Sequence, residues 1–137
     1  MQNRGKAMIV NTDRDRLAKT LKFAVLEQRP DYAEVRAVVE DAFLNGVDIA
    51  HGGFLFSLCD FACALASNTP ERVAITSNSN IDFIEPVKPN ETVLAFAELV
   101  AGNEKTGVYQ VMITDLGQAK RYAVFRSRVV YKRAMQK

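Results

Sequence analysis

The sequence predicts an α+β domain in which one long, buried helix is wrapped by a curved antiparallel sheet. The helix is expected at residues 53–67, which are apolar on almost every side of a helical wheel. A helix of this kind must be buried on all sides, and in a chain of 137 residues a sheet curled around it is the element able to enclose it. The residues after the helix have the pattern of strands joined by short connections, which favours antiparallel pairing.

Before the helix, residues 12–28 place apolar side chains at helical spacing behind a polar cap, and Pro30 ends the pattern. We expect a surface helix or an ordered arm here and treat residues 1–30 as an N-terminal helical arm. Residues 32–43 partly alternate between apolar and polar side chains. They are expected to form the first strand, which the Asn45-Gly46 pair ends.

Four strands are expected after the helix, at residues 73–84, 92–101, 107–114 and 120–131. Their connections contain turn-forming residues: Pro86 and Pro89 in the first, Gly102 and Asn103 in the second, and Asp115 to Gly117 in the third. Short connections predict a meander, in which consecutive strands pair. One long central helix followed by an antiparallel meander that wraps around it is the hotdog fold, and we treat residues 1–137 as a single domain.

The composition is that of a soluble globular protein, with 48% apolar residues, 25% charged residues and a formal net charge of +2. The basic residues form no long block with interleaved aromatics, so we expect no nucleic-acid partner. The longest apolar run, residues 54–66, is shorter than the roughly 20 residues of a membrane span. The first residues lack the apolar core of a secretory signal. We therefore expect no membrane partner and a cytoplasmic location.

Cys59 and Cys63 are four residues apart in the expected helix, and no second pair is present to complete a zinc site. We interpret both as small core residues rather than as redox or metal-binding residues. No metal site is expected.

Asp60 is the most informative residue, because it lies in the middle of the apolar helix. Aspartate is rarely buried without a partner or a function, since an unpaired buried carboxylate is costly or has a raised pKa. We therefore treat Asp60 as a candidate catalytic residue. The alternative is a structural role, in which the carboxylate caps the backbone or pairs with an arginine.

His51, Gly52 and Gly53 lie at the entrance of the same helix. N–H groups at a helix N-terminus point outward and carry partial positive charge, and glycines let a substrate come close to the backbone. This arrangement suits a carbonyl that becomes an oxyanion, although a loop that needs glycine only for its turn is the bland alternative. His51, the single histidine, is also a candidate general base, but an orienting role fits it better because Asp60 already supplies a base.

Gly52 and Asp60 are eight residues apart, which along a helix is about 12 Å and too far for both to act on one carbonyl carbon. If two copies pack with their central helices antiparallel about a two-fold axis, Gly52 of one faces Asp60 of the other, and two equivalent sites result. A catalytic function for these residues therefore predicts an obligate homodimer.

At these residues the sequence resembles the PaaI-like thioesterases of the hotdog superfamily. The similar stretches are LNGVDIAHGGFLFSLCDFACALASN (residues 44–68), ITSNSNIDFIEPVKPNETV (residues 75–93) and KTGVYQV (residues 105–111). The His-Gly-Gly run followed after eight residues by aspartate is fairly specific for the family. Residues 1–36 depart from the family pattern, because a longer and more basic segment replaces a compact one.

The resemblance implies hydrolysis of an acyl-CoA to a carboxylic acid and CoA, with coenzyme A as part of the substrate and no further cofactor. Asp60 corresponds to the carboxylate that acts as general base or nucleophile, and Gly52 to the backbone donor to the thioester carbonyl. Asn45 and His51 correspond to side chains that orient this end of the site, and Thr76 to a hydroxyl that faces the aspartate. We expect homodimers that assemble as a homotetramer.

Further residues are candidates for binding the substrate. Gly53 lies at the helix entrance, and the aromatic side chains Phe54, Phe56 and Phe61 are able either to line an acyl pocket or simply to fill the core. Lys105, Arg126 and Arg128 are candidates for the phosphates of CoA, the last two on one face of a strand, with a solvated sheet face as the alternative.

Two other functions are compatible with the predicted fold. Hotdog hydratases also act on acyl thioesters, but they resemble one another in pairing a catalytic histidine with an acidic residue in a different local motif. The His-Gly-Gly run followed by Asp60 within the helix argues against this function. A non-catalytic acyl-CoA-binding module is the second, and the joint presence of Asp60, Gly52, Asn45 and Thr76 speaks against it.

Overall fold

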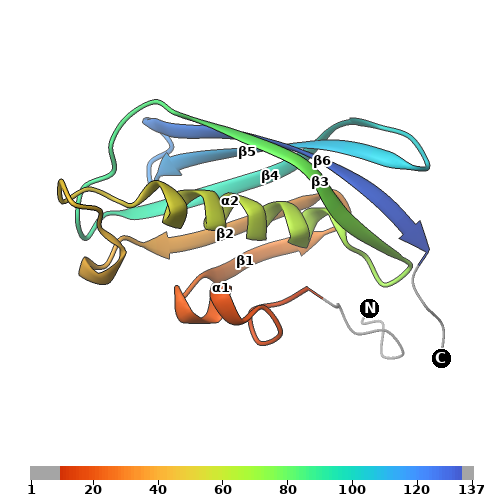
Figure 1. Ribbon diagram of the computed structural model, residues 1–137, viewed down its shortest axis with the longest axis horizontal. Helices are drawn as coiled ribbons and strands as arrows, with labels where there is room; N and C mark the ends of the chain where they lie inside the picture. The colour runs from red at the N-terminus through yellow and green to blue at the C-terminus, as the bar shows by residue number, and fades with distance from the viewer. Residues whose placement is uncertain (1–9, 134–137) are drawn as a thin grey trace.

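One long helix, α2 (Gly52–Ser67), lies in the concave side of a six-stranded antiparallel sheet in the computed structural model, which describes residues 10–133 (Figure 1). The strands are β1 (Ala24–Arg29), β2 (Tyr32–Val38), β3 (Arg72–Phe83), β4 (Thr92–Gly102), β5 (Thr106–Asp115) and β6 (Arg121–Arg133). The shorter helical segments are α1 (Arg16–Thr20) and the 3-10 turn η1 (Asp41–Phe43). The predicted hotdog arrangement of a central helix in a curved antiparallel sheet is confirmed.

The core forms between α2 and the inner face of the sheet. Leu58 and Leu65 of α2 are fully buried, and so are Tyr109, Val111 and Ile113, which alternate along β5 and face the helix. The predicted bounds of α2 and of the four strands after it agree with the structure to within two residues. Within residues 10–133, no helix has the length and the hydropathy that crossing a membrane requires.

The predicted helix over residues 12–28 is correct only for its first part. α1 ends at Thr20, Lys22 adopts a positive φ of 61°, and the residues from Ala24 to Arg29 form the edge strand β1. The reversal at Lys22 turns the ring of Phe23 into the core, where 4% of its surface is exposed. Burial of this ring and pairing of β1 with β2 together override the helical spacing of the apolar residues. The expected first strand, residues 32–43, likewise ends early, at Val38, and η1 follows it.

The order of the strands is β1-β2-β4-β5-β6-β3, which corrects the predicted meander at one point. The connections from β4 to β5 and from β5 to β6 are hairpins, as expected. β3, however, pairs with β6 at the sheet edge, so residues 84–91, with Pro86 and Pro89, carry the chain from that edge to the middle of the sheet. This crossover passes the N-terminal end of α2 (Figure 1), and the outer edge of β3 has no partner strand among the described residues.

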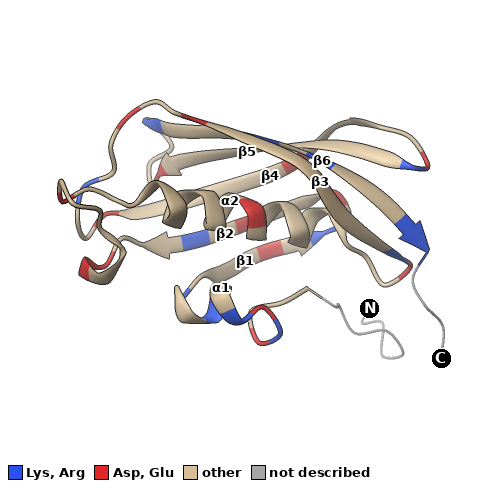
Figure 2. Ribbon diagram, viewed as in Figure 1, with Lys and Arg blue, Asp and Glu red and all other residues tan. Residues whose placement is uncertain are grey.

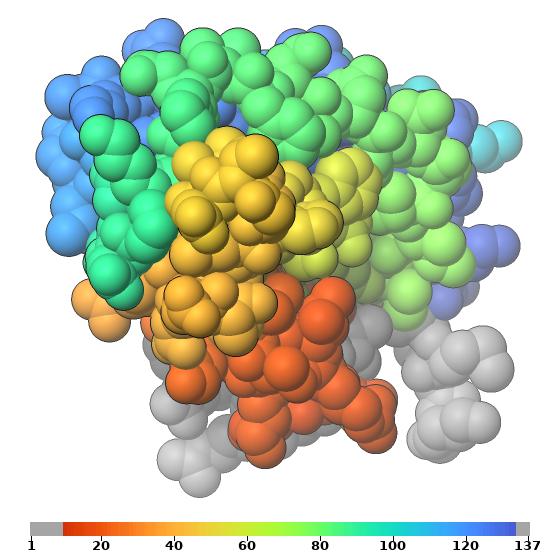
Figure 3. Space-filling view, turned by 60° about the vertical axis from the view of Figure 1, so that its left-hand side comes forward, coloured from red at the N-terminus to blue at the C-terminus, as the bar shows by residue number. Residues whose placement is uncertain are grey.

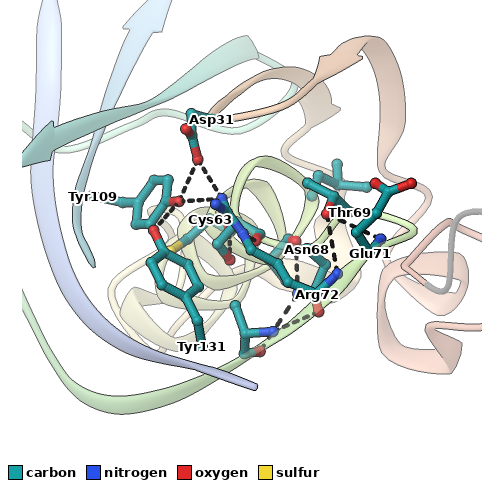
Figure 4. A network of polar contacts seen from close by, with 12 residues as sticks. Asp31, Cys63, Asn68, Thr69, Glu71, Arg72, Tyr109 and Tyr131 are labelled. Atoms are coloured by element: carbon teal, nitrogen blue, oxygen red, sulfur yellow. Dashed lines mark hydrogen bonds and ion pairs between the residues drawn. The ribbon is translucent and has the colours of Figure 1, made fainter. Parts of the chain in front are cut away.

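A polar network fixes the other end of α2 to the sheet (Figure 4). The Arg72 guanidinium donates to Asp31 Oδ1 (2.5 Å), to the Tyr109 hydroxyl (3.0 Å) and, through Nε, to the Ser67 carbonyl (3.0 Å). Tyr109 in turn donates to Asp31 Oδ1 and contacts the Tyr131 hydroxyl at 2.6 Å. Burial, followed by these hydrogen bonds, raises the pKa of Tyr109 well above its ordinary value, so it stays protonated as a donor.

Candidate functional site

A loop of fixed shape leads into the N-terminus of α2. Leu44 and Ala50 form an isolated bridge, and Asn45 closes the turn between them, with Oδ1 accepting from the N–H groups of Val47 (3.0 Å) and Ile49 (3.2 Å). The Asn45 N–H donates to the Ile49 carbonyl (2.8 Å). Asn45 therefore holds the loop through its oxygen, while its side-chain amide nitrogen has no hydrogen-bond partner within residues 10–133.

His51 caps the first turn of α2. Its Nδ1 accepts a hydrogen bond from the Gly53 N–H (2.9 Å), and its carbonyl accepts from the N–H groups of Phe54 (2.9 Å) and Leu55 (3.2 Å). The N–H groups of Gly53 and Phe54 are two of the four that a helix start leaves without a regular intrahelical partner, and the His51 N–H, a third, donates to the Phe43 carbonyl (2.8 Å). The fourth, the Gly52 N–H, has no acceptor in the described part of the chain. His51 is engaged in the helix start, which is compatible with the orienting role expected from the sequence.

Gly52 lines a pocket of about 490 Å³ at this end of the molecule. Figure 3 looks towards this end, where the segment around residue 45 lies beside the crossover from β3 to β4. The walls are mostly apolar and come from the loop before α2, the start of α2, the end of β3 and the crossover after it. The main lining residues are Ile49, Leu55, Phe83, Ile84, Pro86 and Val87, with Asn45 and Glu85 as polar members. The Phe83 ring packs so closely on Gly52 that a Cβ added to Gly52 would lie 3.2 Å from it. A free N–H beside an apolar pocket suits a carbonyl attached to an apolar chain.

One face of α2 is left open by the sheet. Gly53, Ser57, Asp60 and Ala64, spaced four, three and four residues apart, form this open stripe, which α1 borders on one side and β3 on the other. Gly53 and Asp60 are exposed, and Ser57 and Ala64 are half-buried. The expectation that this chain alone buries the helix on all sides is therefore wrong, because the sheet does not curve far enough to cover the stripe.

Asp60 is the single acidic residue of α2 and gives the helix its one negatively charged turn (Figure 2). The residue has exposed surface, which corrects the expectation of a buried aspartate within one chain. Enough of the chain nevertheless surrounds its carboxylate to desolvate it. Burial raises the pKa of Asp60 above its ordinary value of 3.8, and the negative charge of Asp15 raises it further.

A single chain does not bring Gly52 and Asp60 together. They lie eight residues apart on one helix, about 12 Å along its axis, and Asp60 does not line the pocket at Gly52. Thr76, the third predicted member, is exposed on β3 just before a bulge, on the side that faces the helix because Ala74 of the same strand packs on the core. Its hydroxyl has no hydrogen bond to any described residue.

The aromatic candidates belong to the core rather than to this pocket. Phe54 and Phe61 are 5% and 3% exposed and surround the ring of Phe23, and Phe54 also stacks on Phe43 (4.9 Å between ring centroids). Phe56 is half-buried and packs edge-on against Phe125. None of the three phenylalanines singled out from the sequence lines the pocket at Gly52.

The basic candidates lie away from the pocket as well. Arg126 and Arg128 are exposed on the outer face of β6, where Arg126 donates to Gln110 Oε1 (3.1 Å) and Arg128 to Ser77 Oγ (2.9 Å). Lys105 is exposed in the turn from β4 to β5, at the end of the molecule opposite the N-terminus of α2 (Figure 1). Within one chain, none of these three cations meets the pocket.

Both cysteines are fully buried in the core, as expected. Burial raises the pKa of the Cys63 thiol to about 12 and that of Cys59 well above its ordinary value, so neither is a thiolate at neutral pH. Within residues 10–133, no three histidine, cysteine or acidic side chains gather into a group able to hold a metal ion.

Two parts of the site were not identified from the sequence. Phe83 and Ile84, at the wall of the pocket, are 52% and 60% exposed, and the signal for them was two consecutive apolar residues at the end of an alternating strand. Asp15, whose charge acts on Asp60, gave no signal, because its position depends on how α1 packs.

Comparisons with known proteins identify the family and the fold of the chain. The family model of the thioesterase superfamily matches residues 48–121. The acyl-coenzyme A thioesterase PaaI of Escherichia coli is 35% identical over 116 residues, which cover 85% of this chain and 82% of that protein. The E. coli PaaI structure aligns with a TM-score of 0.83 over 91% of this chain and 88% of that one. A Streptococcus mutans protein with bound acetyl CoA is 25% identical and aligns with a TM-score of 0.77 over 83% of this chain and 91% of that one.

Proposed function

The chain belongs to the thioesterase superfamily and is a thioester hydrolase; we propose that it hydrolyses acyl-CoA at a site shared between Gly52 of one subunit and Asp60 of another. The observation that carries the proposal is the free Gly52 N–H at an apolar pocket, on the same helix as a single carboxylate on an open stripe. The name of the E. coli relative and the acetyl CoA bound to the S. mutans protein support CoA as the carrier.

Gly52 supplies the electrophilic half of the site. A thioester carbonyl that enters with its acyl chain in the apolar pocket accepts a hydrogen bond from the Gly52 N–H, at the positive end of the α2 dipole. The hydrogen bond becomes stronger as negative charge develops on the carbonyl oxygen in the transition state, and this difference lowers the barrier to hydrolysis. Asn45 and His51 hold the loop and the helix start that aim this N–H.

Asp60 supplies the nucleophilic half, either by taking a proton from water or by attacking the carbonyl itself. Its raised pKa makes it a better proton acceptor than an ordinary aspartate. In the first mechanism, hydroxide adds to the carbonyl carbon and the C–S bond then breaks. A thiol with a pKa near 8.5 is a fair leaving group, so no strong acid is needed. Thr76 is proposed to hold the water beside Asp60.

The shared site requires a homodimer with antiparallel α2 helices. Three of the four positions on the open stripe are the small residues Gly53, Ser57 and Ala64, which permit close approach of a second helix. Next to it, the outer edge of β3 has no partner strand within residues 10–133 and Ile75 is half exposed (50%), a surface that a second copy would cover. We expect a dimer, paired further into a tetramer, in analytical ultracentrifugation; an active monomer at assay concentration would contradict the shared site.

Hydrolysis of a panel of thioesters by the purified protein tests the reaction. The panel contains short, medium and aryl acyl-CoAs and one acyl-carrier-protein thioester, and a colorimetric thiol reagent detects the product. Because both native cysteines are fully buried, the folded protein itself adds little background. Asp60→Asn is the control, since it keeps the shape of the side chain and removes its basicity.

We expect turnover of at least one acyl-CoA that the Asp60→Asn variant loses. Binding of CoA esters without hydrolysis of any panel member would favour a binding module instead. Turnover of an enoyl-CoA to its hydroxyacyl product, with no thiol released, would favour a hydratase.

A further inference from the structure

The crossover segment in the wall of the pocket is held at both ends. The N–H groups of Ile84 and Glu85 both donate to the Tyr122 carbonyl (2.8 and 3.2 Å), and the Val87 carbonyl accepts from the Ala50 N–H (2.8 Å). The Val87 side chain is 1% exposed and anchors the segment in the core. The backbone of Glu85 therefore has a fixed place at the pocket.

Glu85 is the one charged residue that lines this pocket within residues 10–133. Asn45, the other polar member, is neutral, and no lysine or arginine is among the lining residues. The Glu85 side chain is exposed and makes no hydrogen bond or ion pair with any described residue. Its carboxylate thus places a negative charge without a partner at the wall of an apolar pocket.

The lysines that follow in the chain act on another carboxylate. A hydrogen bond from the Tyr122 hydroxyl (2.7 Å) and one from the Lys88 N–H (2.8 Å) lower the pKa of Glu91, and the charges of Lys120 and Lys88 lower it further. Neither lysine lines the pocket. An acidic group that enters the pocket therefore meets Glu85 and no described cation of the same chain.

The pocket has room for an acyl group that extends well beyond its carbonyl. An apolar cavity of about 150 Å³ holds a benzene ring, and this pocket has a volume of about 490 Å³. A sphere of that volume is about 10 Å across, which is close to the Debye length at physiological ionic strength. The charge of Glu85 is therefore incompletely screened throughout the pocket.

We propose that Glu85 is a specificity-determining residue, which makes the enzyme select uncharged acyl groups and disfavour acyl groups that end in a carboxylate. The inference rests on the proposed function, in which the Gly52 N–H holds the thioester carbonyl and the acyl chain occupies the pocket. A terminal carboxylate would lose water among the apolar walls and meet a like charge at Glu85. An uncharged chain of the same length suffers neither effect.

A pair of substrates of equal chain length, hexanoyl-CoA and adipyl-CoA, tests the inference. The measured quantity is the ratio of kcat/KM for adipyl-CoA to kcat/KM for hexanoyl-CoA, which we expect to be well below one in the wild type. Glu85→Gln keeps the size of the side chain and removes its charge. We expect it to raise the ratio about three- to tenfold, the scale of one partly screened pair of like charges. Glu85→Lys should raise the ratio further, because it attracts the terminal carboxylate.

Glu104→Gln is the matched control. Glu104 is exposed in the turn from β4 to β5, so its substitution removes the same charge far from the pocket and should leave the ratio unchanged. Added salt gives a second readout, which a purely structural role of Glu85 would not move. Because Glu85 is exposed, 0.5 M NaCl should raise the wild-type ratio towards that of Glu85→Gln.

Calorimetric binding of the two esters separates this inference from the proposed reaction. The Asp60→Asn variant is titrated with each ester, with and without Glu85→Gln, and the preference in Kd for hexanoyl-CoA should become smaller when the charge is removed. Equal ratios in the wild type, Glu85→Gln and Glu85→Lys would overturn the inference and leave the hydrolase assignment in place. A wild type that hydrolyses neither ester would contradict the proposed function, and the Kd values would then decide whether Glu85 selects the acyl group. Binding of neither ester would contradict both.

Discussion

Replacing Gly52 with proline removes the proposed oxyanion donor and leaves the rest of the helix start in place. Proline is favoured at the first position of a helix, where its missing N–H is one that the helix does not use. His51 has φ −63° and ψ 135°, the extended conformation that a residue before proline requires. The Gly52 N–H has no acceptor within residues 10–133, so the substitution breaks no hydrogen bond of the described chain.

The size of the effect follows from the role of the N–H. Removing one oxyanion donor typically costs about 10²- to 10³-fold in kcat, or about 2.7–4 kcal/mol of transition-state stabilisation. Proline also adds a Cβ that would lie 3.2 Å from the Phe83 ring. Gly52→Ala adds the same Cβ and keeps the N–H, and Phe83 is 52% exposed and therefore free to shift. We expect the kcat of the alanine variant to fall by less than about tenfold, and this loss measures the steric effect of the added Cβ.

The assay compares kcat and KM of the two variants on the preferred acyl-CoA, with circular dichroism and Tm to establish that both remain folded. The difference between proline and alanine isolates the hydrogen bond from the added bulk. If the folded proline variant turns over as fast as the alanine variant, the Gly52 N–H does not stabilise the oxyanion, and the catalytic assignment of the helix entrance is wrong.

Asp60→Asn should keep the oligomer and lose roughly two orders of magnitude or more in turnover. Folding raises the pKa of Asp60, so the stability that its protonated form contributes is fully present below the ordinary pKa of 3.8 and is lost as pH rises through the raised pKa. At pH 7 the ionised carboxylate of the wild type is therefore disfavoured, and thermal unfolding should show Asp60→Asn to be at least as stable as the wild type. The difference in Tm between the two proteins should become smaller in acid. Heterodimers formed by mixing inactive Gly52→Pro and Asp60→Asn subunits should regain activity, since one site becomes intact, and well-mixed dimers without activity would refute the shared site. Gly107→Ala should lower the free energy of unfolding by about 1–3 kcal/mol, because the added Cβ would overlap the Tyr131 hydroxyl. Gly46→Ala is the control, since nothing lies within 4 Å of a Cβ added there. Equal Tm values for the two variants would contradict the close packing of Tyr131 on Gly107.

The parts of the fold with a strong local signal were predictable. α2 begins at the glycine pair that follows His51, and β4, β5 and β6 are separated by turn residues that set their ends. The region before α2 was harder, because the apolar residues around β1 also fit helical spacing. The choice between helix and strand there depends on the burial of Phe23 and on pairing with β2, and neither is a property of the local sequence.

The position of β3 at the sheet edge could not be predicted either. The residues between β3 and β4 contain two prolines and look like any short connection, and pairing with β6 is a contact between distant parts of the chain. This error matters for the site, because a hairpin would not have carried Phe83 and Ile84 past the N-terminus of α2. The pocket wall is thus a consequence of topology, while Gly52 itself was predictable from its place at the helix start.

The packing of one chain does not account for the apolar residues on all sides of α2. The sheet covers only part of the helix, and the stripe that it leaves open carries glycine, serine and alanine where a solvated helix would carry charged side chains. The one charge on it, Asp60, already has a raised pKa because of burial, although one face of the helix is still open. The composition of α2 is that of a helix buried on all sides, but the sheet leaves one side uncovered. This favours a second copy of the chain, rather than solvent, as the neighbour of that side. The same contact would bring Asp60 to the partner subunit's Gly52 and complete the site.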